Sequence, residues 1–333
     1  MIRNRRTAVP ETAVAAKDAK QHTGYRFAAV LLFLCLLVPA EAAAQDEAGA
    51  YAAPGREFDL KLSSGYRLGG LRWNIAGDLS GENPNILSEL TWSKLQILQF
   101  EGQGRLNIER LTIRANVGYG LVLAGDTQDS DYNLDDRTDE FSRSYSDARG
   151  GYLLYALVGW GRCYELESAQ VSLAPMIGIG FHRQAMVMAD GVQVIPPDGP
   201  FPGLDSSYTA NWLDAWIGLD VEYQIARRVS TGAAVSVHPS LYYAAADWNL
   251  RPDFMHPVSF THRTSGLGLC GELSAGIAVS RSFLLEARFA LDYWFGGHGV
   301  DETYWAVGGS TKTRLNEVVW RSAQFTLGTV LRL

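Results

Sequence analysis

The chain has 333 residues and a formal net charge of −7, and 47% of its residues are hydrophobic. An acidic chain of this kind argues against nucleic acid as a partner, because phosphate backbones bind basic surfaces. The sequence contains no Cys and His cluster with zinc spacing, no recognisable nucleophile arrangement and no Gly-rich phosphate loop. Composition and motifs therefore point away from nucleic-acid binding, zinc-finger and nucleotide-hydrolysing proteins.

The N-terminal segment has the features of a secretory signal peptide. Scattered basic residues precede an apolar run from Phe27 to Ala40, and Ala42-Ala43-Ala44 follows. The run is too short to span a bilayer and ends in small residues of the Ala-x-Ala type. We predict cleavage after Ala44, which makes residues 1–44 the signal peptide and residues 45–333 the mature domain, with a membrane anchor as the alternative. Cleavage would remove six basic and three acidic residues and change the net charge from −7 to −10.

Two of the 3 cysteines, Cys163 and Cys270, belong to the mature chain. Export to an oxidising compartment permits a disulfide between them. Nothing in the sequence places the two residues together, and a disulfide needs closely spaced Cα atoms. We therefore expect two separate thiols.

Alternation of apolar residues with small or polar residues dominates the mature sequence, as in the segments 171–181 and 213–223. This period of two predicts β-strands with one apolar face, although a soluble β-sandwich would alternate as well. Connection lengths distinguish the two, since short turns alternate with long connections near 125–146, 187–207, 245–263 and 298–316. That asymmetry is typical of an outer-membrane barrel. Aromatic residues near the strand ends predict two interfacial girdles: Tyr152, Trp160, Trp212, Tyr223, Tyr242, Tyr243, Tyr293, Trp294 and Trp320.

The predicted fold is all-β: a ten-stranded antiparallel transmembrane β-barrel with long extracellular loops and short periplasmic turns. An even number of strands leaves both termini in the periplasm, and the expected location is the bacterial outer membrane. Ten strands leave little room for an aqueous channel, so we expect function in the long loops and the outer rim. The strands are predicted near 56–73, 87–106, 110–124, 147–166, 169–186, 208–226, 229–245, 263–279, 283–297 and 317–333.

An acidic step, Asp129-Ser130-Asp131, follows the third predicted strand. Residues i and i+2 of an extended chain point to the same side, so repulsion between the two carboxylates should raise the pKa of at least one. A pair of this kind can activate water. The alternative is an ordinary solvated loop, because Asp135, Asp136 and Asp139 follow closely.

Three short segments resemble those of one known family. Ser88-Glu89-Leu90-Thr91-Trp92 resembles the family's Ser-x-Leu-Asp-Trp step, and Asp129-Ser130-Asp131-Tyr132 resembles its Asp-x-Asp-Trp step. The segment from Tyr208 to Leu219 resembles the start of its sixth strand. In this order and spacing the chain resembles the omptins, the ten-stranded outer-membrane endopeptidases of Gram-negative bacteria.

The resemblance implies a catalytic arrangement at the rim. In omptins two aspartates face an Asp-His pair across the rim, and water held between them attacks the peptide carbonyl. Asp129 and Asp131 match the first pair, and Asp247 and Asn249 match the second, with Asn249 where the family has His. An amide cannot act as a base, and losing a positioned base typically costs about 10²–10⁴ in rate. The resemblance therefore implies an aspartate-type endopeptidase that is impaired.

Two histidines farther along the chain, His256 and His262, are candidate substitutes for the missing base. The family's preference for basic substrates depends on acidic pocket residues, and Leu71 and Ala245 occupy those positions here. The resemblance also implies a requirement for lipopolysaccharide or other outer-membrane lipid, but no cofactor. Its expected partners are that lipid and a peptide or protein substrate.

A barrel without catalytic activity is the main alternative. Its rim would bind a surface partner through aromatic loop residues such as Tyr208 and Trp248, or the barrel would have a structural role. A calcium-binding loop is a further alternative, because residues 129–140 supply oxygen ligands at positions one, three, five, seven and twelve. Position six of that loop is Leu134 instead of the usual Gly. The five candidate ligands are Asp129, Asp131, Asn133, Asp135 and Glu140.

Overall fold

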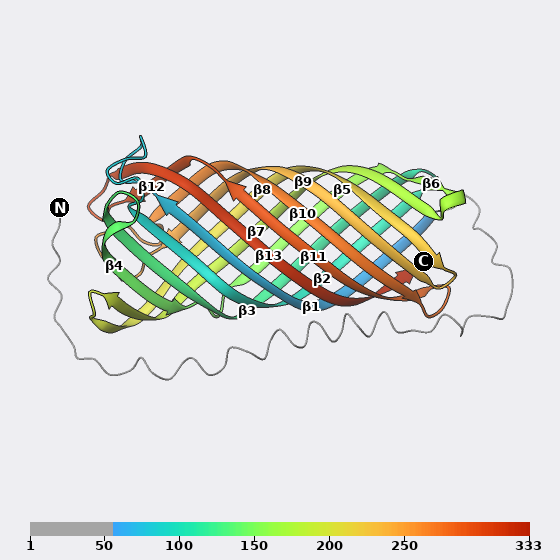
Figure 1. Ribbon diagram of the computed structural model, residues 1–333, viewed down its shortest axis with the longest axis horizontal. Helices are drawn as coiled ribbons and strands as arrows, with labels where there is room; N and C mark the ends of the chain where they lie inside the picture. Colours follow the sequence, from blue (N-terminus) through green and yellow to red (C-terminus); the bar gives the residue numbers. More distant parts are fainter. Residues whose placement is uncertain (1–55) are drawn as a thin grey trace. The chain divides into compact units, whose positions relative to one another are not determined.

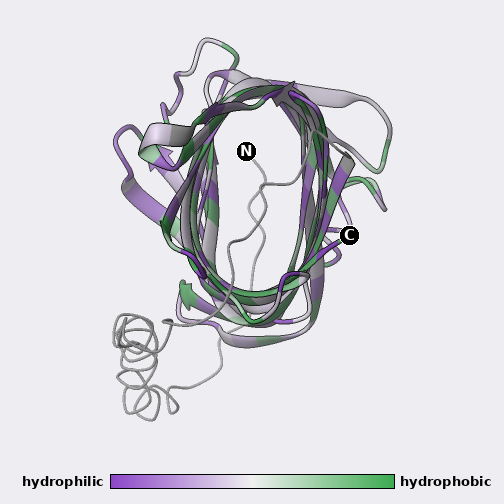
Figure 2. Ribbon diagram, turned by 90° about the vertical axis from the view of Figure 1, so that its right-hand side faces the viewer, coloured by the Kyte–Doolittle hydropathy of each residue, from purple (hydrophilic) through white to green (hydrophobic). Residues whose placement is uncertain are grey.

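In the computed structural model, residues 56–333 are described, and they form one antiparallel sheet that closes on itself (Figure 1). Closure is made by β1, which pairs with β2 on one side and with β13 on the other. Figure 2 shows the strands as a closed ring in which hydrophobic and hydrophilic residues alternate. The predicted signal peptide lies outside the described residues.

Thirteen strands and one short 3-10 helix, Glu167–Ala169, make up the described elements. No helix among them is long and apolar enough to cross a membrane. The strands are β1 Arg56–Ile75, β2 Ser88–Ile108, β3 Leu111–Leu134, β4 Thr138–Asp147, β5 Tyr152–Arg162, β6 Tyr164–Leu166, β7 Val171–Ile195, β8 Gly199–Ala226, β9 Val229–Asp247, β10 Phe260–Ala278, β11 Phe283–Gly296, β12 Gly299–Tyr304 and β13 Ser310–Arg332.

The thirteen strands occupy ten positions around the ring. β4, β5 and β6 follow one another between β3 and β7, and β11 and β12 both lie between β10 and β13. The predicted ten-stranded barrel is therefore confirmed. One feature differs, because β3, β7 and β8 continue well into the connections predicted as loops. Hydrogen bonds of the hairpin ladders satisfy the backbone there, as in β3 with β4.

The two ends of the barrel differ as the connection lengths predict. β4 and β12 lie at one end, called the mouth here, and β6 and the C-terminus lie at the other (Figure 1). Between the ends, the outer face carries large apolar side chains that are more than half exposed, which is the surface a lipid-facing band requires. They include Leu62, Val117, Ile179, Leu213, Ile217, Val235, Leu241, Leu273 and Leu291.

The aromatic girdle was only partly predicted. Trp160, Tyr223, Tyr243 and Tyr293 are exposed on the outer face as expected. Four others face the interior and are at most 3% exposed, because their strand parity places them on the inner side: Trp212, Tyr242, Trp294 and Trp320. With Trp73, Trp92 and Tyr208 they fill the barrel below the mouth, and we call these seven residues the aromatic floor. The ring centroids of Trp92 and Tyr208, from opposite parts of the wall, are 5.3 Å apart.

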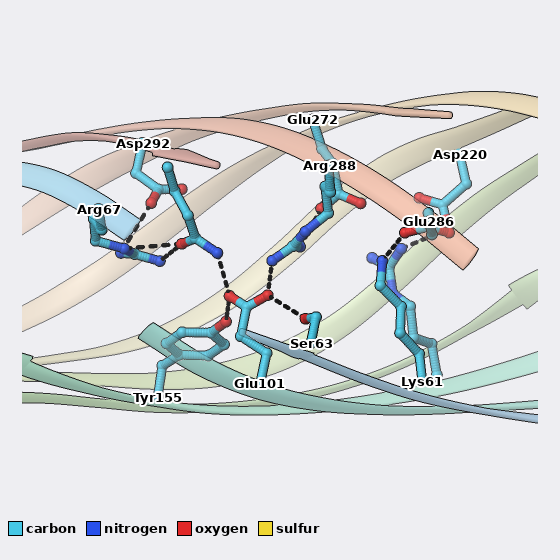
Figure 3. A network of polar contacts seen from close by, with 12 residues as sticks. Lys61, Ser63, Arg67, Glu101, Tyr155, Asp220, Glu272, Glu286, Arg288 and Asp292 are labelled. Atoms are coloured by element: carbon cyan, nitrogen blue, oxygen red, sulfur yellow. Dashed lines mark hydrogen bonds and ion pairs between the residues drawn. The ribbon is translucent and has the colours of Figure 1, made fainter. Parts of the chain in front are cut away.

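Below the aromatic floor, a network of charged side chains crosses the lumen (Figure 3). Arg288 of β11 pairs with Glu101 of β2 and, at 2.6 Å, with Glu272 of β10. Arg67 lies 3.2 Å from Asp292, and Lys61 pairs with Glu286. Charged side chains thus cross the interior, and each cation named here has an acidic partner.

Cys163 and Cys270 are both free thiols, which confirms the expectation of two separate thiols. Cys163 follows β5, near the short-turn end, whereas Cys270 lies on β10 opposite Asp292 and Ser236.

Candidate functional site at the mouth

Asp129 and Asp131 lie within β3 and not in a loop, which corrects the prediction of a loop from residue 125. In the ladder with β2, Asp129 pairs with Leu90 and Asp131 pairs with Ser88. Directly opposed residues share a face of the sheet, and the neighbouring buried pair is Trp92 with Thr127. The two half-buried carboxylates therefore point into the mouth, above the aromatic floor.

The environment separates the two carboxyl groups chemically. Burial raises the pKa of Asp129 well above its usual value, and the neighbouring charge of Asp131 raises it further. Burial also raises the pKa of Asp131, but hydrogen bonds from Ser88 and Ser142 oppose that rise. The expected rise is confirmed, and it is larger at Asp129, which therefore keeps its proton to a higher pH than Asp131 does.

Arg251 is the cation that acts on both carboxyl groups of this pair. It lies in the connection between β9 and β10, and its charge lowers the pKa of Asp129 and of Asp131. Its guanidinium is held by Asp253 at 2.9 and 3.0 Å and lies 4.1 Å from the ring centroid of Phe254. Sequence reasoning missed Arg251, although it stands only two residues after Asn249.

Asp247 and His256 form a second pair. His256 Nδ1 lies 2.5 Å from Asp247 Oδ1, and its Nε2 lies 3.2 Å from the backbone oxygen of Arg251. Both partners are hydrogen-bond acceptors, which favours the protonated ring, and the hydrogen bond to Asp247 raises the pKa of His256. Of the two candidate substitutes, His256 is the one that meets Asp247.

The structure brings each pair together but does not join one pair to the other. Asp247 is opposite Ser207, whereas the adjacent residues Ala246 and Tyr208 are buried in the interior. Because side chains alternate between the two faces of a strand, the side chain of Asp247 lies on the outer face of the barrel wall. Among residues 56–333, no hydrogen bond or ion pair links Asp247 or His256 to the Asp129–Asp131 pair.

Asn249 links two mouth segments. Its Oδ1 accepts hydrogen bonds from the backbone nitrogen of Asp205 and from Ser206 Oγ, both at 2.9 Å. Its Nδ2 donates to the backbone oxygen of Gly203 at 2.7 Å. The side chain thus fastens the β9–β10 connection to β8, which is a positioning role.

His262 lies in the aromatic interior and not at the rim surface. It is 0% exposed, its Nδ1 lies 2.9 Å from the Tyr208 hydroxyl, and its Nε2 lies 3.2 Å from Asp301 Oδ1. Tyr208 is itself 0% exposed, and Trp248 packs on Phe260 with ring centroids 4.7 Å apart. The prediction that Tyr208 is a surface anchor is therefore wrong, whereas Trp248 is partly buried.

The segment proposed as a calcium loop is a β-hairpin. Residues up to Leu134 belong to β3, and Thr138 begins β4. Asp135 accepts a hydrogen bond from the Asn85 backbone at 2.7 Å, and Glu140 pairs with Arg143 at 2.8 Å. An extended strand cannot wrap oxygen ligands around one ion, so this geometry does not suit a calcium site.

Comparison with known proteins agrees with the barrel. The family model described as Protochlamydia outer membrane protein matches residues 61–331. The outer membrane protease OmpT from Escherichia coli has a TM-score of 0.70 at 14% identity, covering 83% of this chain and 97% of that chain. A search of curated proteins finds no match.

Other barrels are less similar. The translocator domain of the autotransporter NalP from Neisseria meningitidis has a TM-score of 0.35 at 10% identity, covering 93% of this chain and 98% of that chain. A major outer membrane protein from Thermus thermophilus has a TM-score of 0.33 at 9% identity, covering 84% of this chain and all of that chain, 100%. Family match and fold together establish an outer-membrane β-barrel, and the identity to OmpT shows the fold alone.

Proposed function

The chain belongs to the Protochlamydia outer membrane protein family, and we propose that its mouth hydrolyses peptide bonds with water activated by Asp129 and Asp131. The observation that carries this proposal is the pair of inward carboxyl groups with raised pKa values on adjacent inward positions of β3. The fold that OmpT shares, whose printed name is that of an outer membrane protease, supports the proposal.

The chemistry follows from the different states of the two carboxyl groups. Charged Asp131 accepts a proton from water, which attacks the peptide carbonyl, while protonated Asp129 donates to the carbonyl oxygen. As the C–N bond breaks, Asp131 passes its proton to the departing amine, and Asp129 takes its proton back as the carbonyl reforms. Residues i and i+2 of a strand are about 6.6 Å apart along the chain, which leaves room for a water molecule between the carboxyl groups. Arg251 provides positive charge for the developing oxyanion.

This mechanism differs from the one that the omptin resemblance implies. It uses Asp131 and no histidine as the base, because both nitrogens of His256 are engaged by Asp247 and by the Arg251 backbone, and Asn249 is fully hydrogen-bonded. Asp247 and Asn249 act in it only by positioning the connection that carries Arg251. We therefore expect Asn249→His to bring no acceleration, since it breaks the link to β8 and adds no base beside Asp131.

A binding mouth without hydrolysis is the second candidate. It is favoured by the position of Arg251, whose charge partly neutralises the two acids that would activate water. In that case a peptide with both acidic and basic groups would bind to the mouth and remain intact.

The proposal is tested with mature protein refolded in lipopolysaccharide-containing micelles and mixed with a diverse peptide library, with products read by mass spectrometry. We expect cleavage by the wild type and a fall of about 10²–10⁴ in rate for Asp131→Asn. Asp126→Asn, which changes an exposed carboxylate of the same strand, is the matched control and should keep the activity. If no peptide is cut but peptides bind, hydrolysis is excluded and the binding function stands.

A further inference from the structure

Three neighbouring strands bring two histidines and an aspartate together inside the lumen. His182 lies on β7, Asp214 on β8 and His238 on β9. In the ladders, Asp214 is opposite Gly180 and Ser240, so each histidine is its diagonal neighbour across a strand pair. All three face inward, with Asp214 4% and His238 2% exposed.

The distances among these side chains suit a metal ion. One ligand atom from each residue lies within 4.8 Å of the others. His182 Nε2 is 3.5 Å from Asp214 Oδ2, close to the spacing of two ligands around a tetrahedral zinc ion with bonds of about 2.0–2.2 Å. His238 Nδ1 is 2.7 Å from Asp214 Oδ1, a hydrogen bond that a metal ion would replace.

Two ligand atoms of the cluster have no hydrogen-bond partner among the described residues. Asp214 Oδ2 and His182 Nε2 are buried without a hydrogen bond among the described residues. The side chain of Asp214 is 0% exposed, and leaving a buried carboxylate oxygen unpaired is costly. An ion bound between the two atoms would satisfy both.

The surroundings hold the ligands in place. Ser236 Oγ lies 2.8 Å from His238 Nε2, so it can accept a hydrogen bond from that N–H group when Nδ1 binds a metal. A Cβ at position 180 would lie 2.6 Å from Asp214 Oδ2, and Gly180 thus keeps the space beside that oxygen open. The Trp294 ring covers the site, and its centroid lies 4.4 Å from the centroid of the His182 ring and 5.1 Å from that of the His238 ring.

A cavity of about 110 Å³ adjoins the two histidines and gives room for a further ligand. Arg67 lines the same cavity and would repel a cation. The carboxylate of Asp292, 3.2 Å from its Nη1, compensates its charge, and its Nε donates to Gln324 at 2.9 Å. Cys270, on the same wall, is free but is not one of the clustered ligands.

We propose that His182, Asp214 and His238 bind one divalent transition-metal ion of the zinc type, with water from the adjoining cavity as a fourth ligand. Two imidazole nitrogens and one carboxylate oxygen are a ligand set that zinc accepts with three protein ligands. The ion would join β7, β8 and β9 from inside the barrel. The site is separate from the mouth and does not depend on hydrolysis there.

The test uses untagged, refolded mature barrel that has been stripped with a chelator and then titrated with Co²⁺ or Zn²⁺. We expect about one ion per chain, a tetrahedral Co²⁺ absorption spectrum and a higher melting temperature with Zn²⁺. Asp214→Asn and His182→Gln should lose the ion and the thermal shift. His256→Gln, which removes a histidine outside the lumen, should change neither.

Ser236→Ala keeps all three ligands and removes only the hydrogen bond to His238. It should weaken metal affinity by roughly 10–100-fold while the barrel remains folded by circular dichroism. This variant decides the matter if the ligand variants fail to fold. A wild type that binds no ion, or an affinity that Ser236→Ala leaves unchanged, would overturn the proposal.

Discussion

Buried charged groups are paired in the lumen of this barrel, but in its mouth two carboxyl groups lack ion-pair partners in the part of the chain that the structure describes. In the lumen, each cation of the network has an acidic partner, as Arg288 has Glu101 and Glu272. In the mouth, Asp129 and Asp131 share one face of β3 with no ion-pair partner within 4.0 Å among the described residues, and only the more distant charge of Arg251 opposes theirs. Compensated charge stabilises the wall, whereas uncompensated charge leaves carboxyl groups that can exchange protons at the surface.

The largest effect should come from breaking the compensation in the lumen. Arg288→Ala leaves Glu101 and Glu272 unpaired, and we expect a loss of about 3–5 kcal/mol in the free energy of unfolding. Urea unfolding in micelles measures it. The control is Arg149→Ala, whose exposed pair with Asp147 spans 3.8 Å and should contribute less than about 1 kcal/mol. Equal losses for the two variants would contradict the contrast between buried and exposed pairs.

A smaller effect is expected where Asn249 fastens the mouth. Asn249→Ala removes hydrogen bonds to Gly203, Asp205 and Ser206 and should cost about 1–3 kcal/mol, confined to the mouth. Hydrogen exchange should speed up in residues 203–206 and 248–251 and stay unchanged in the lumen. Faster exchange throughout the barrel would show that Asn249 is not a local link.

The uncompensated pair should reduce stability as the pH rises. Folding raises the pKa of Asp129. The contribution of this group to the free energy of unfolding is therefore fully present below its pKa in the unfolded chain, about 3.9, and is lost as the pH rises through its pKa in the folded protein. Asp129→Asn should therefore stabilise the barrel at pH 8, by about 1.4 kcal/mol for each unit of the shift, and bring no gain at pH 3. A destabilised variant at pH 8 would contradict this assignment.

The smallest effect concerns the exposed pair at the outer side of the mouth. Asp247 raises the pKa of His256. The stabilisation of the fold by this pair is therefore fully present below the pKa of His in the unfolded chain, about 6.5, and is lost as the pH rises through the pKa of His256 in the folded protein. An NMR titration of His256 should show a midpoint above 6.5 that falls in Asp247→Asn. An unchanged midpoint would mean that the 2.5 Å hydrogen bond does not persist in solution.

The strands could be predicted from sequence because their alternation is local. Leu213, Ile217 and Leu219 show the outward face without any knowledge of their neighbours. The extension of β3 to Leu134 could not be predicted, because polar hairpins outside the membrane lack that alternation. Trp212 and Trp294 were assigned to the girdle because composition near a strand end does not give strand parity, and a one-residue slip exchanges the two faces.

Candidate sites depend on register, which explains what the sequence missed. The proximity of Asp129 and Asp131 could be predicted, because residues i and i+2 of one strand lie on the same side whatever the register of its neighbours. The contact between Asp247 and His256 depends on how a long connection folds, and the cluster of His182, Asp214 and His238 needs two strand registers at once. Each of these histidines was visible in the sequence, but their common position was not.

The most direct test of the proposed hydrolysis is the rate of cleavage of one library peptide as a function of pH, for the wild type and for Asp129→Asn. We predict a wild-type rate that falls as the pH rises through the raised pKa of Asp129, and a rate in the variant that is lower and lacks this fall. No cleavage at any pH, or identical profiles for the two proteins, would contradict a catalytic role of the Asp129–Asp131 pair.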